Sequence, residues 1–253
     1  MKLHWHWNLI YINRPCDLNL IILPSRNRNN MAQDELVLLD CWVSPFCMRV
    51  KIALTEKGVP FEVRAEENLL SAKSLLLLAS NPVHKKVPVL LYNGKPICES
   101  TIILGFIDET WASPPLLPPC AYGKAQARFW ADFIDKKVFD GGKAIWTSKG
   151  EVEVEAAKDA FIETLKQLEE TLGEKDFFGC NNAFGFVDIT LIAITSWFLA
   201  YEKFGGFKVE EHCPKLSAWI YRCKERDSVS KTLPDSQNVY EFVVMLRKMF
   251  GVE

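Results

Sequence analysis

The chain has 253 residues, of which 49% are hydrophobic and 25% are charged, and its formal net charge is −2. This composition is typical of a globular protein with one or two domains and excludes disorder of the whole chain. The nearly balanced charge excludes a broad basic surface for nucleic acid or anionic lipid. No apolar run approaches the roughly 20 residues that a membrane-spanning helix needs.

Eight cysteines and four histidines are scattered along the chain without a metal-binding or disulfide pattern. No Cys-x-x-Cys pair occurs, and a chain of this length has its own core. We therefore expect free thiols in a reducing compartment, a cytoplasmic location and no metal site.

Residues 1–30 differ from the rest of the chain. They begin with the pattern His4-Trp5-His6-Trp7 and end in a polar Asn/Arg-rich stretch. They contain neither the apolar core and cleavage site of a secretory signal nor the Ser-rich amphipathic pattern of a transit peptide. Met31 then opens a sequence that resembles an ordinary start. We expect 1–30 to be a disordered or misassigned extension, with a targeting role as the alternative.

A strand, a helix and a second strand follow in order. Residues 35–40 form a short apolar run, which predicts a buried strand. Ser44 and Pro45 have the residue types of a helix N-cap and first helical position, and Gly58 marks the end of that helix. Residues 60–63 predict the second strand, so the unit is β-α-β.

The next fifty residues complete a small α/β domain. A short helix is predicted near 73–80, and residues 87–92 and 95–98 predict two strands. Between them lies Asn93-Gly94, the strongest two-residue signal for a hairpin turn. Glu99 and Ser100 then begin a helix that extends to about residue 111. The order β-α-β-α-β-β-α is typical of a thioredoxin-like domain.

Four prolines between residues 112 and 120 prevent a helix there and predict a linker. Beyond it the strands disappear, and helical periodicity recurs in five segments: 122–146, 152–172, 188–204, 214–226 and 236–250. The predicted fold is therefore an α/β thioredoxin-like N-terminal domain followed by an all-α domain. The predicted divisions are the extension at 1–30, the first domain at 33–111, the linker at 112–121 and the helical domain at 122–253.

The motif Ser44-Pro45-Phe46-Cys47 lies where the first strand meets the first helix. Thioredoxin-like folds hold their reactive group at this corner, because the helix N-terminus stabilises a thiolate. Redox members have cysteine at the first position. A serine there cannot form a disulfide, and no neighbouring base would activate it as a nucleophile. Its hydroxyl can instead donate a hydrogen bond to a thiolate supplied by a small molecule, for which glutathione is the natural candidate.

Six stretches carry a resemblance to a known family: 42–46, 81–90, 93–100, 128–132, 185–189 and 240–242. With them, residues 33–253 resemble plant glutathione transferases of the tau class. The resemblance implies the two-domain architecture of cytosolic glutathione transferases and the reaction of reduced glutathione with an electrophile to give an S-conjugate. It also implies a homodimer, a role in detoxification and stress response, and glutathione as a cosubstrate without a permanently bound cofactor.

By this resemblance, Ser44 is the catalytic residue that stabilises the glutathione thiolate. Glu99 and Ser100 match the site of the γ-glutamyl group, where a helix N-terminus holds a carboxylate. The same three residues are also ordinary helix-capping residue types, and one residue can serve both purposes.

The resemblance assigns the rest of the glutathione site to two loops and a structural role to a core helix. Val87 precedes the family's cis-proline, Pro88, and its backbone would pair with the cysteinyl part of glutathione. Lys73 and Lys86 match residues that meet the glycine carboxylate, and solvated surface lysines are the alternative. Asp188 would cap the start of a core helix, which is a structural role.

An apolar electrophile pocket is expected between the two domains. The resemblance implies seven lining residues: Trp42, Phe46, Phe133, Lys137, Trp197, Phe242 and Leu246. Each aromatic residue at helical spacing could instead belong to the core. Phe242 and Leu246, four residues apart, would share one face of a late helix.

Three functions remain open at this point. The first is conjugation of glutathione to hydrophobic electrophiles, with peroxidase activity as a side reaction. The second is thiol exchange at Cys47, which occupies the second cysteine position of the redox motif. The third is a carrier of apolar ligands without turnover. Replacement of Ser44 by alanine separates the first from the third, because only conjugation needs the hydroxyl.

Overall fold

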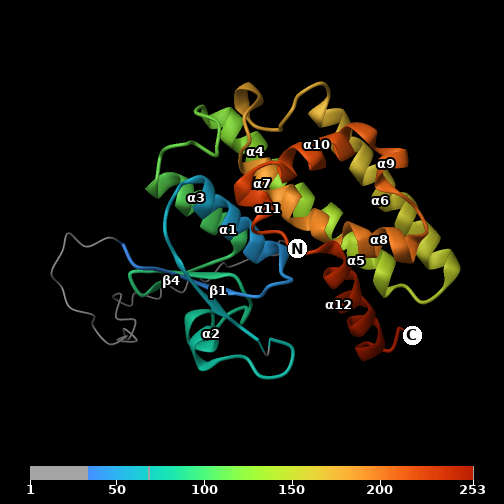
Figure 1. The fold of residues 1–253 in the computed structure, drawn as a ribbon, viewed down its shortest axis with the longest axis horizontal. Coiled ribbons are helices and arrows are strands. Elements are labelled where there is room, and N and C mark those ends of the chain that lie inside the picture. Colours follow the sequence, from blue (N-terminus) through green and yellow to red (C-terminus); the bar gives the residue numbers. More distant parts are fainter. Residues whose placement is uncertain (1–33, 68, 253) are drawn as a thin grey trace, which may run out of the picture. The chain divides into compact units, whose positions relative to one another are not determined.

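The computed structural model describes residues 34–67 and 69–252, and residues 34–253 form one compact unit. Its first half contains a four-stranded sheet of β1 (Leu36–Asp40), β2 (Glu62–Ala65), β3 (Val89–Tyr92) and β4 (Lys95–Cys98) (Figure 1). The strand order is β2-β1-β3-β4; β1 is parallel to β2, and the other pairs are antiparallel. The predicted β-α-β-α-β-β-α order is confirmed. The expectations for residues 1–30 lie outside the described residues.

All five residues of β1 are buried because helices cover both faces of the sheet. On one face, Leu36 and Leu38 pack in the main core with α1 (Pro45–Glu56) and α3 (Ser100–Thr110). On the other face, Val37 and Leu39 pack with Leu77 of α2 (Leu75–Ser80). Alternation of side chains along a strand sends neighbouring residues to opposite faces. This explains why the strand has no polar face in its sequence.

The turn between β3 and β4 has the geometry that its residues favour. Asn93 and Gly94 both have positive φ, 50° and 77°. Two consecutive left-handed residues match the twist of an antiparallel pair, and Asn-Gly accepts that conformation at low cost. The Asn93 side chain also accepts a hydrogen bond from the Glu35 backbone N–H at 2.9 Å. The predicted hairpin is confirmed.

The second half of the described chain is helical, as predicted. Figure 1 shows these helices beside the sheet domain, from green (α4) through yellow and orange to red (α12). Their bounds are α4 Ala121–Phe133, the π-helical turn η1 Ile134–Phe139, α5 Asp140–Thr147, α6 Glu151–Leu172, the 3-10 turn η2 Cys180–Asn182, α7 Phe186–Ile192, the 3-10 turn η3 Ala193–Trp197, α8 Phe198–Gly205, α9 Val209–His212, α10 Pro214–Lys224, α11 Asp227–Ser230 and α12 Ser236–Met249.

Two of the predicted long helices contain a change of helical type. The segment predicted at 122–146 includes the π turn η1, and the segment predicted at 188–204 includes the 3-10 turn η3. Periodicity alone does not reveal these, because a single tight or wide turn shifts the phase of the apolar pattern but leaves a helical pattern on either side of it. The short helices α9 and α11 are additional to the prediction; four residues are too few to show a period.

The start of α7 is held by the buried carboxylate of Asp188. It accepts hydrogen bonds from the backbone N–H groups of Gly185 (3.0 Å) and Phe178 (2.9 Å) and from the Trp219 indole (2.8 Å). Burial raises the pKa of Asp188 to about 6 although these donors oppose the shift. A Cβ on Gly185 would lie 2.7 Å from the carbonyl oxygen of Leu116. The close approach explains why glycine occupies a position where serine would cap better.

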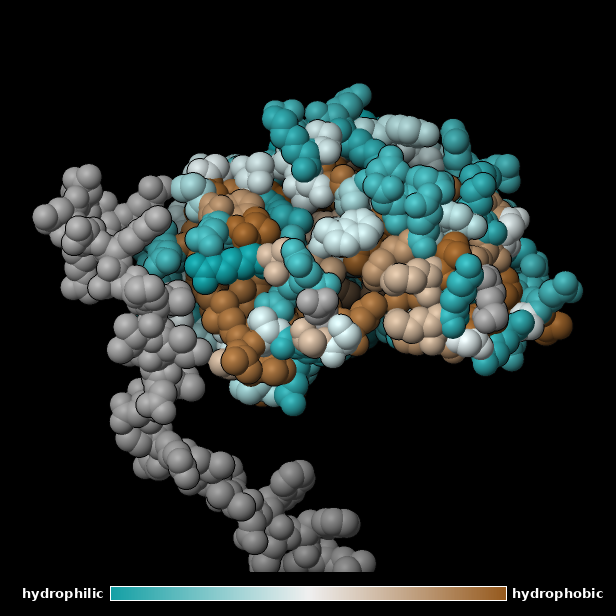
Figure 2. All heavy atoms as spheres, turned by 60° about the horizontal axis from the view of Figure 1, so that its bottom comes forward, coloured by the Kyte–Doolittle hydropathy of each residue, from teal (hydrophilic) through white to brown (hydrophobic). Residues whose placement is uncertain are grey.

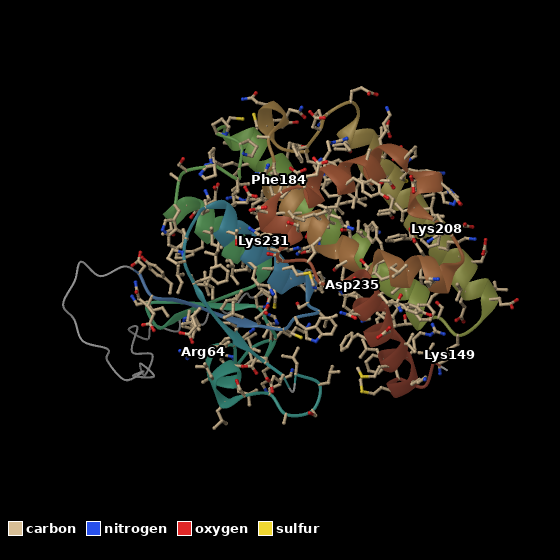
Figure 3. All side chains as sticks on the ribbon, in the orientation of Figure 1. Arg64, Lys149, Phe184, Lys208, Lys231 and Asp235 are labelled. Atoms are coloured by element: carbon tan, nitrogen blue, oxygen red, sulfur yellow. The ribbon has the colours of Figure 1, made fainter. Side chains whose placement is uncertain are left out.

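The last long helix, α12, is capped by Asp235, the residue before its first turn, which Figure 3 labels. Its carboxylate accepts from the backbone N–H of Gln237 at 2.7 Å and of Asn238 at 3.4 Å. The cap fixes where α12 leaves the preceding loop. Within the described residues, no helix combines the length and apolarity that crossing a bilayer requires.

Candidate active site

Ser44 is the N-cap of α1, as predicted. Its Oγ accepts a hydrogen bond from the Cys47 backbone N–H at 3.3 Å, and its own backbone N–H donates to the Cys41 carbonyl at 2.9 Å. Pro45 then occupies the first helical position. Because the cap uses only the oxygen, the hydroxyl proton can be donated to a ligand. The side chain is half-buried, at the positive end of the α1 dipole.

Cys47, at the second cysteine position of the redox motif, is buried inside α1. Its exposed fraction is 0%. Burial, reinforced by the charge of Asp40, raises the pKa of the Cys47 thiol far above its ordinary value. A buried thiol with a raised pKa is a poor nucleophile. The Cys47 side chain therefore serves packing, and its burial gives no support to a thiol-exchange function.

A small cavity of about 120 Å³ lies between the first turn of α1, the start of β3 and the start of α3. Six residues line it: Phe46, Lys86, Val87, Pro88, Glu99 and Ser100. The Val87–Pro88 peptide bond is cis. The structure thus brings together four predicted glutathione-binding residues and the predicted cis-proline, which are separated by up to fourteen positions in sequence.

The start of α3 presents a carboxylate, from Glu99, and a hydroxyl, from Ser100, to this cavity. Glu99 has φ of 70°, and its carboxylate lies 3.8 Å from His84 Nε2. Ser100 is buried, and its Oγ accepts from Arg49 Nη1 at 3.1 Å. Free backbone N–H groups at a helix start can bind an anion. The arrangement suits a ligand that carries an ammonium and a carboxylate on one carbon.

Arg49 is the residue that sequence reasoning missed. Its side chain is fully buried, and its guanidinium donates to the Thr190 carbonyl (3.0 Å), Ser100 Oγ (3.1 Å) and Asp135 Oδ1 (2.5 Å). The same group lies 4.9 Å from the centre of the Phe46 ring. Burial lowers the pKa of Arg49, and the Asp135 carboxylate opposes this. The available signal was a charged residue three positions after Phe46, on the apolar face of a predicted helix.

The two predicted lysines flank the loop that leads to the cis-proline. Lys73 Nζ donates to the carbonyl of Lys85 at 2.8 Å, and the carbonyl of Lys86 accepts from Asn81 Nδ2 at 2.9 Å. Lys86 lines the cavity, whereas Lys73 contacts the loop behind it. Both side chains are exposed.

Five aromatic rings form a chain beside Ser44, which we call the aromatic cluster. The successive ring centres are 5.8 Å, 6.3 Å, 6.4 Å and 4.8 Å apart, in the order Trp42, Phe242, Trp197, Phe139 and Phe46. All four pairs are edge-to-face, which is a favoured geometry for aromatic contacts. Figure 2, which turns the lower side of Figure 1 forward, shows hydrophobic residues on both sides of a hollow.

The cluster contains four of the seven predicted pocket residues: Trp42, Phe46, Trp197 and Phe242. Among the other three, Phe133 has its ring contact with Trp130 at 5.3 Å, Lys137 is exposed, and Leu246 is buried one turn after Phe242. Phe139 is a member that the sequence did not indicate. It ends the π turn η1, which shifts the helical period after Phe133.

No group of three or more His, Cys, Asp or Glu side chains that could hold a metal ion occurs in residues 34–67 and 69–252. The polar groups near Ser44 are instead those that bind a charged organic molecule: two helix N-termini, a buried arginine, a carboxylate and a lysine.

Comparisons with known proteins agree with this geometry. The family "Glutathione S-transferase, N-terminal domain" matches residues 34–109, and "Glutathione S-transferase, C-terminal domain" matches residues 151–222. The chain is 56% identical over 216 residues to glutathione S-transferase 3 of Glycine max, covering 85% of this chain and 97% of that protein. It is 56% identical over 221 residues to glutathione S-transferase U25 of Arabidopsis thaliana, covering 87% and 98%.

Solved structures show the same likeness. A rice glutathione transferase in complex with glutathione superposes with a TM-score of 0.82 at 49% identity, covering 87% of this chain and 99% of that one. A tau-class enzyme from mango gives a TM-score of 0.79 at 40% identity, covering 84% and 98%. The described chain thus has the fold of these enzymes over both halves, with glutathione as the family's cosubstrate, and it belongs to the tau class of plant glutathione S-transferases.

Proposed function

We propose that Ser44 is the catalytic residue of this transferase and that it acts by stabilising the thiolate of bound glutathione. The observation that carries the proposal is the position of its hydroxyl. The Oγ caps α1 while its proton remains available, and Phe46, two residues further on, lines the cavity with Val87, Glu99 and Ser100. A donated hydrogen bond and a helix dipole both favour the charged form of a thiol, so both lower its pKa.

The γ-glutamyl end of glutathione would bind at the start of α3. Its carboxylate would meet Ser100 and the helix N-terminus, and its ammonium would meet Glu99. The backbone of Val87 would pair with the cysteinyl group, and Lys86 and Lys73 would attract the glycine carboxylate. These contacts leave the sulfur at the start of α1. The first half of the chain, 33–111, is then the glutathione-binding domain.

The chemical step forms no covalent intermediate with the protein, because the reacting thiolate belongs to glutathione. The thiol proton leaves to solvent, and the thiolate forms a carbon–sulfur bond at the electrophile. A haloaromatic substrate releases halide together with the electrons of the carbon–halogen bond. An enone instead moves its own π electrons toward its carbonyl oxygen, and the resulting enolate is then protonated. The protein contributes orientation and electrostatic stabilisation. Hydroperoxide reduction would use the same thiolate as a side activity.

The aromatic cluster supports hydrophobic electrophiles as the second substrate. Its rings come from both halves of the chain, and Trp42 is 48% exposed. Edge-to-face rings offer apolar contact with few fixed polar groups, which permits electrophiles of different shape. Domain 122–253 would then supply most of the electrophile site.

The test is Ser44→Ala, measured by conjugation of a haloaromatic substrate across pH and by the ultraviolet absorbance of the bound thiolate. We expect kcat/KM at neutral pH to fall by roughly 10²-fold, as for loss of one donor to a developing anion. The apparent pKa of the bound thiol should rise, while glutathione still binds. Ser44→Thr keeps the hydroxyl and should retain more activity. Wild-type turnover by Ser44→Ala would contradict the mechanism.

The same variant tests the carrier alternative. Binding of a fluorescent apolar ligand should persist in Ser44→Ala, because the aromatic cluster does not include the hydroxyl. If the wild type binds glutathione and the ligand but conjugates no electrophile, the carrier function is the better description.

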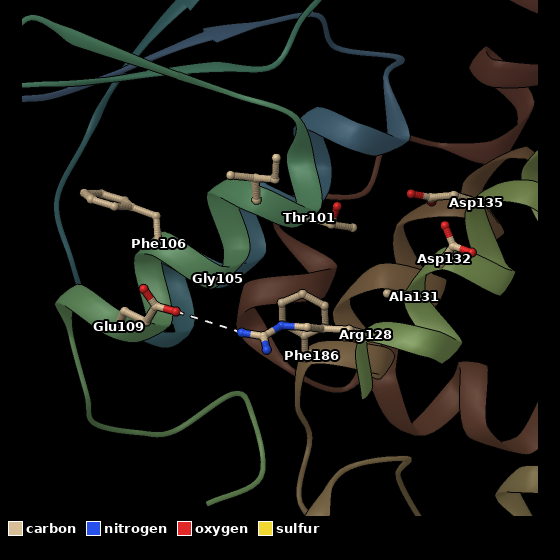
Figure 4. A pocket seen from close by; sticks show the side chains of 10 residues that line it. Thr101, Gly105, Phe106, Glu109, Arg128, Ala131, Asp132, Asp135 and Phe186 are labelled. Carbon is tan, nitrogen blue, oxygen red and sulfur yellow. Dashed lines mark ion pairs between the residues drawn. The ribbon is translucent and has the colours of Figure 1, made fainter. Parts of the chain in front are cut away.

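A homodimer through α3 and α4 completes the proposal. A cavity of about 440 Å³ lies between these helices, and Figure 4 shows the Arg128–Glu109 ion pair at its edge, with the two groups 3.9 Å apart. Ile102 and Phe129 expose 61% and 56% of their surface on these two helices. A second copy related by a twofold axis would use this same face and would bury both exposed apolar side chains.

Sedimentation of the wild type and of Ile102→Glu tests the dimer. We expect a dimer of 28.9 kDa chains for the wild type and a monomer for the variant, because the new carboxylate would be buried without a partner. A monomeric wild type at micromolar concentration would contradict it.

A cytoplasmic location is the last part of the proposal. The seven cysteines at described positions are all free thiols, including Cys120 and Cys180 at the surface, which suits a reducing compartment. Imaging of a fluorescent fusion of the full chain should show the cytoplasm. A fusion confined to an organelle would contradict this expectation and assign a targeting role to residues 1–30.

A further inference from the structure

Trp197 makes a hydrogen bond between the two halves of the chain. Its indole Nε1 donates to the backbone carbonyl of Val43 at 2.9 Å. The two residues are 6% and 5% exposed, so water does not compete for either group. Trp197 ends the 3-10 turn η3 in the helical half, and Val43 directly precedes Ser44. A residue that sequence reasoning placed only in the electrophile pocket therefore also contacts the catalytic loop.

The carbonyl of Val43 and the N–H of Ser44 belong to the same peptide unit, which is planar and rigid. The N–H end of that unit donates to the Cys41 carbonyl at 2.9 Å. The hydrogen bonds of α1 begin with the Ser44 carbonyl, which accepts from the N–H groups of Cys47 and Met48. The Val43 carbonyl lies outside this ladder and accepts from Trp197 instead. The peptide is thus held at both ends. Its orientation determines where the Ser44 side chain points.

The Trp197 ring is itself fixed. It makes edge-to-face contacts with Phe139 and Phe242 at 6.4 Å and 6.3 Å between ring centres. The preceding residue, Ser196, donates to the Ala193 carbonyl at 3.0 Å and contacts Met48 Sδ of α1 at 3.6 Å. A donor held by packing on both sides can impose its direction on the acceptor.

We propose that Trp197 is a positioning residue for the conjugation reaction: its indole N–H, supplied by the helical half, orients the Val43–Ser44 peptide so that the Ser44 hydroxyl faces the glutathione sulfur. This role is separate from any contact of the ring with the electrophile. It rests on the proposed function of Ser44, through which it acts.

The consequence is a change in thiolate stabilisation rather than in substrate affinity alone. Without the indole N–H, the Val43 carbonyl loses its buried partner and the peptide can rotate toward another donor. The hydroxyl of Ser44 then spends less time directed at the sulfur. We expect the apparent pKa of bound glutathione to rise by about one unit, which lowers the thiolate fraction roughly tenfold at pH values below it.

The experiment compares Trp197→Phe with Phe242→Leu. Trp197→Phe keeps an aromatic ring and removes the N–H donor, whereas Phe242→Leu alters the ring that contacts Trp197 and leaves the donor in place. For Trp197→Phe we expect the pH profile of kcat to move to higher pH, with KM for glutathione within about twofold of wild type. For Phe242→Leu we expect a changed KM for the electrophile and an unmoved profile.

Titration of bound glutathione by thiolate absorbance, without electrophile, gives the decisive reading, because it does not depend on pocket shape. A wild-type thiol pKa in Trp197→Phe overturns the inference. If that variant does not fold, site-specific replacement of Trp197 by its benzothiophene analogue, with sulfur in place of the N–H, keeps the ring volume and gives the same reading.

A double-mutant cycle separates this inference from the proposed function. If Ser44→Ala leaves the thiol pKa unchanged, the proposed function of Ser44 fails. If Ser44→Ala raises it and Trp197→Phe does not, only the inference about Trp197 fails. If Trp197 acts through Ser44, adding Trp197→Phe to Ser44→Ala gives no further shift of the thiol pKa, whereas additive shifts contradict a path through Ser44.

Discussion

The proposed glutathione side and the proposed electrophile side of the active site are built from different kinds of groups. The glutathione side consists of backbone groups and helix starts: the cap of α1 at Ser44, the cis peptide before Pro88 and the first turn of α3. The electrophile side consists of ring edges from five separate elements of the chain, joined as the aromatic cluster. One side presents directed polar groups and the other presents adaptable surface.

This difference follows from what each side has to bind. Glutathione is the same molecule in every turnover, so fixed donors and acceptors can match it without reorganisation. Electrophiles differ, and apolar contacts tolerate differences because they have little direction. Substitutions on the glutathione side should therefore have large effects of one kind. Substitutions on the electrophile side should have smaller effects that depend on the substrate.

The largest effect is expected from Arg49→Met, which removes the buried cation behind the glutathione side. Ser100, Asp135 and the Thr190 carbonyl each lose a donor. Breaking a buried ion pair costs about 3–5 kcal/mol of the free energy of unfolding, and the 32% exposure of the Asp135 side chain places this loss at the lower end of that range. Urea denaturation measures it. Lys136→Met breaks the exposed Lys136–Asp132 pair and should cost less than about 0.5 kcal/mol. Equal costs would contradict the comparison.

A pH-dependent effect is expected at Asp188, which fixes the start of α7 and hence the Thr190 carbonyl. Burial raises the pKa of Asp188 from 3.8 to about 6. The folded state then binds this proton more tightly than the unfolded state, so the group's stabilising contribution is present below pH 3.8 and is lost as pH rises through 6. The wild type should lose roughly 1 kcal/mol from this group between pH 5 and pH 7.5.

Asp188→Asn removes that titration, so its free energy of unfolding should lack this slope. Urea denaturation of both proteins at the two pH values gives the difference directly. If the wild type and Asp188→Asn change in parallel, the buried carboxyl does not titrate in this range.

A smaller, substrate-dependent effect is expected from Phe139→Leu on the electrophile side. The ring contacts Phe46 and Trp197 but lies outside the glutathione cavity. We expect KM for a haloaromatic to change several-fold and KM for glutathione to stay within about twofold. Phe250→Leu is the control, because its ring stacks on Trp146 outside the cluster. A larger change in KM for glutathione than in KM for the haloaromatic would contradict the expected difference between the two sides.

No effect on either side is expected from a chain that begins at Met31. Every residue assigned to the two sides lies between positions 42 and 246. Turnover and both KM values should therefore match those of the full chain within about twofold. A changed value would mean that residues 1–30 reach the site.

The glutathione side was largely predictable because its geometry is local. Ser44-Pro45 predicts a helix start, and Asn93-Gly94 predicts the hairpin that orders β3 and β4, from neighbouring residues alone. Arg49 was not predictable in this way. Its partners lie 51, 86 and 141 positions away, and only the fold brings them together.

For the electrophile side, the sequence predicts that aromatic residues line the pocket but does not predict all of the residues in the aromatic cluster. Helical spacing predicts that aromatic residues share a face, and Trp197 and Phe242 do meet. It assumes a constant 3.6-residue period, however, and η1 breaks that period between Phe133 and Phe139. The hydrogen bond of Trp197 to Val43 joins residues 154 positions apart, and no spacing rule contains it.

The π turn η1 also couples the two sides of the site. It contains Asp135, which accepts a hydrogen bond from Arg49 behind the proposed glutathione side, and it ends at Phe139, a ring of the aromatic cluster. A π turn holds more residues than an α-helical turn, so a deletion there would return the segment to an ordinary α-helix and change the directions of the side chains within it. A single change of length between Ile134 and Phe139 would therefore act on the buried arginine and on the aromatic wall together.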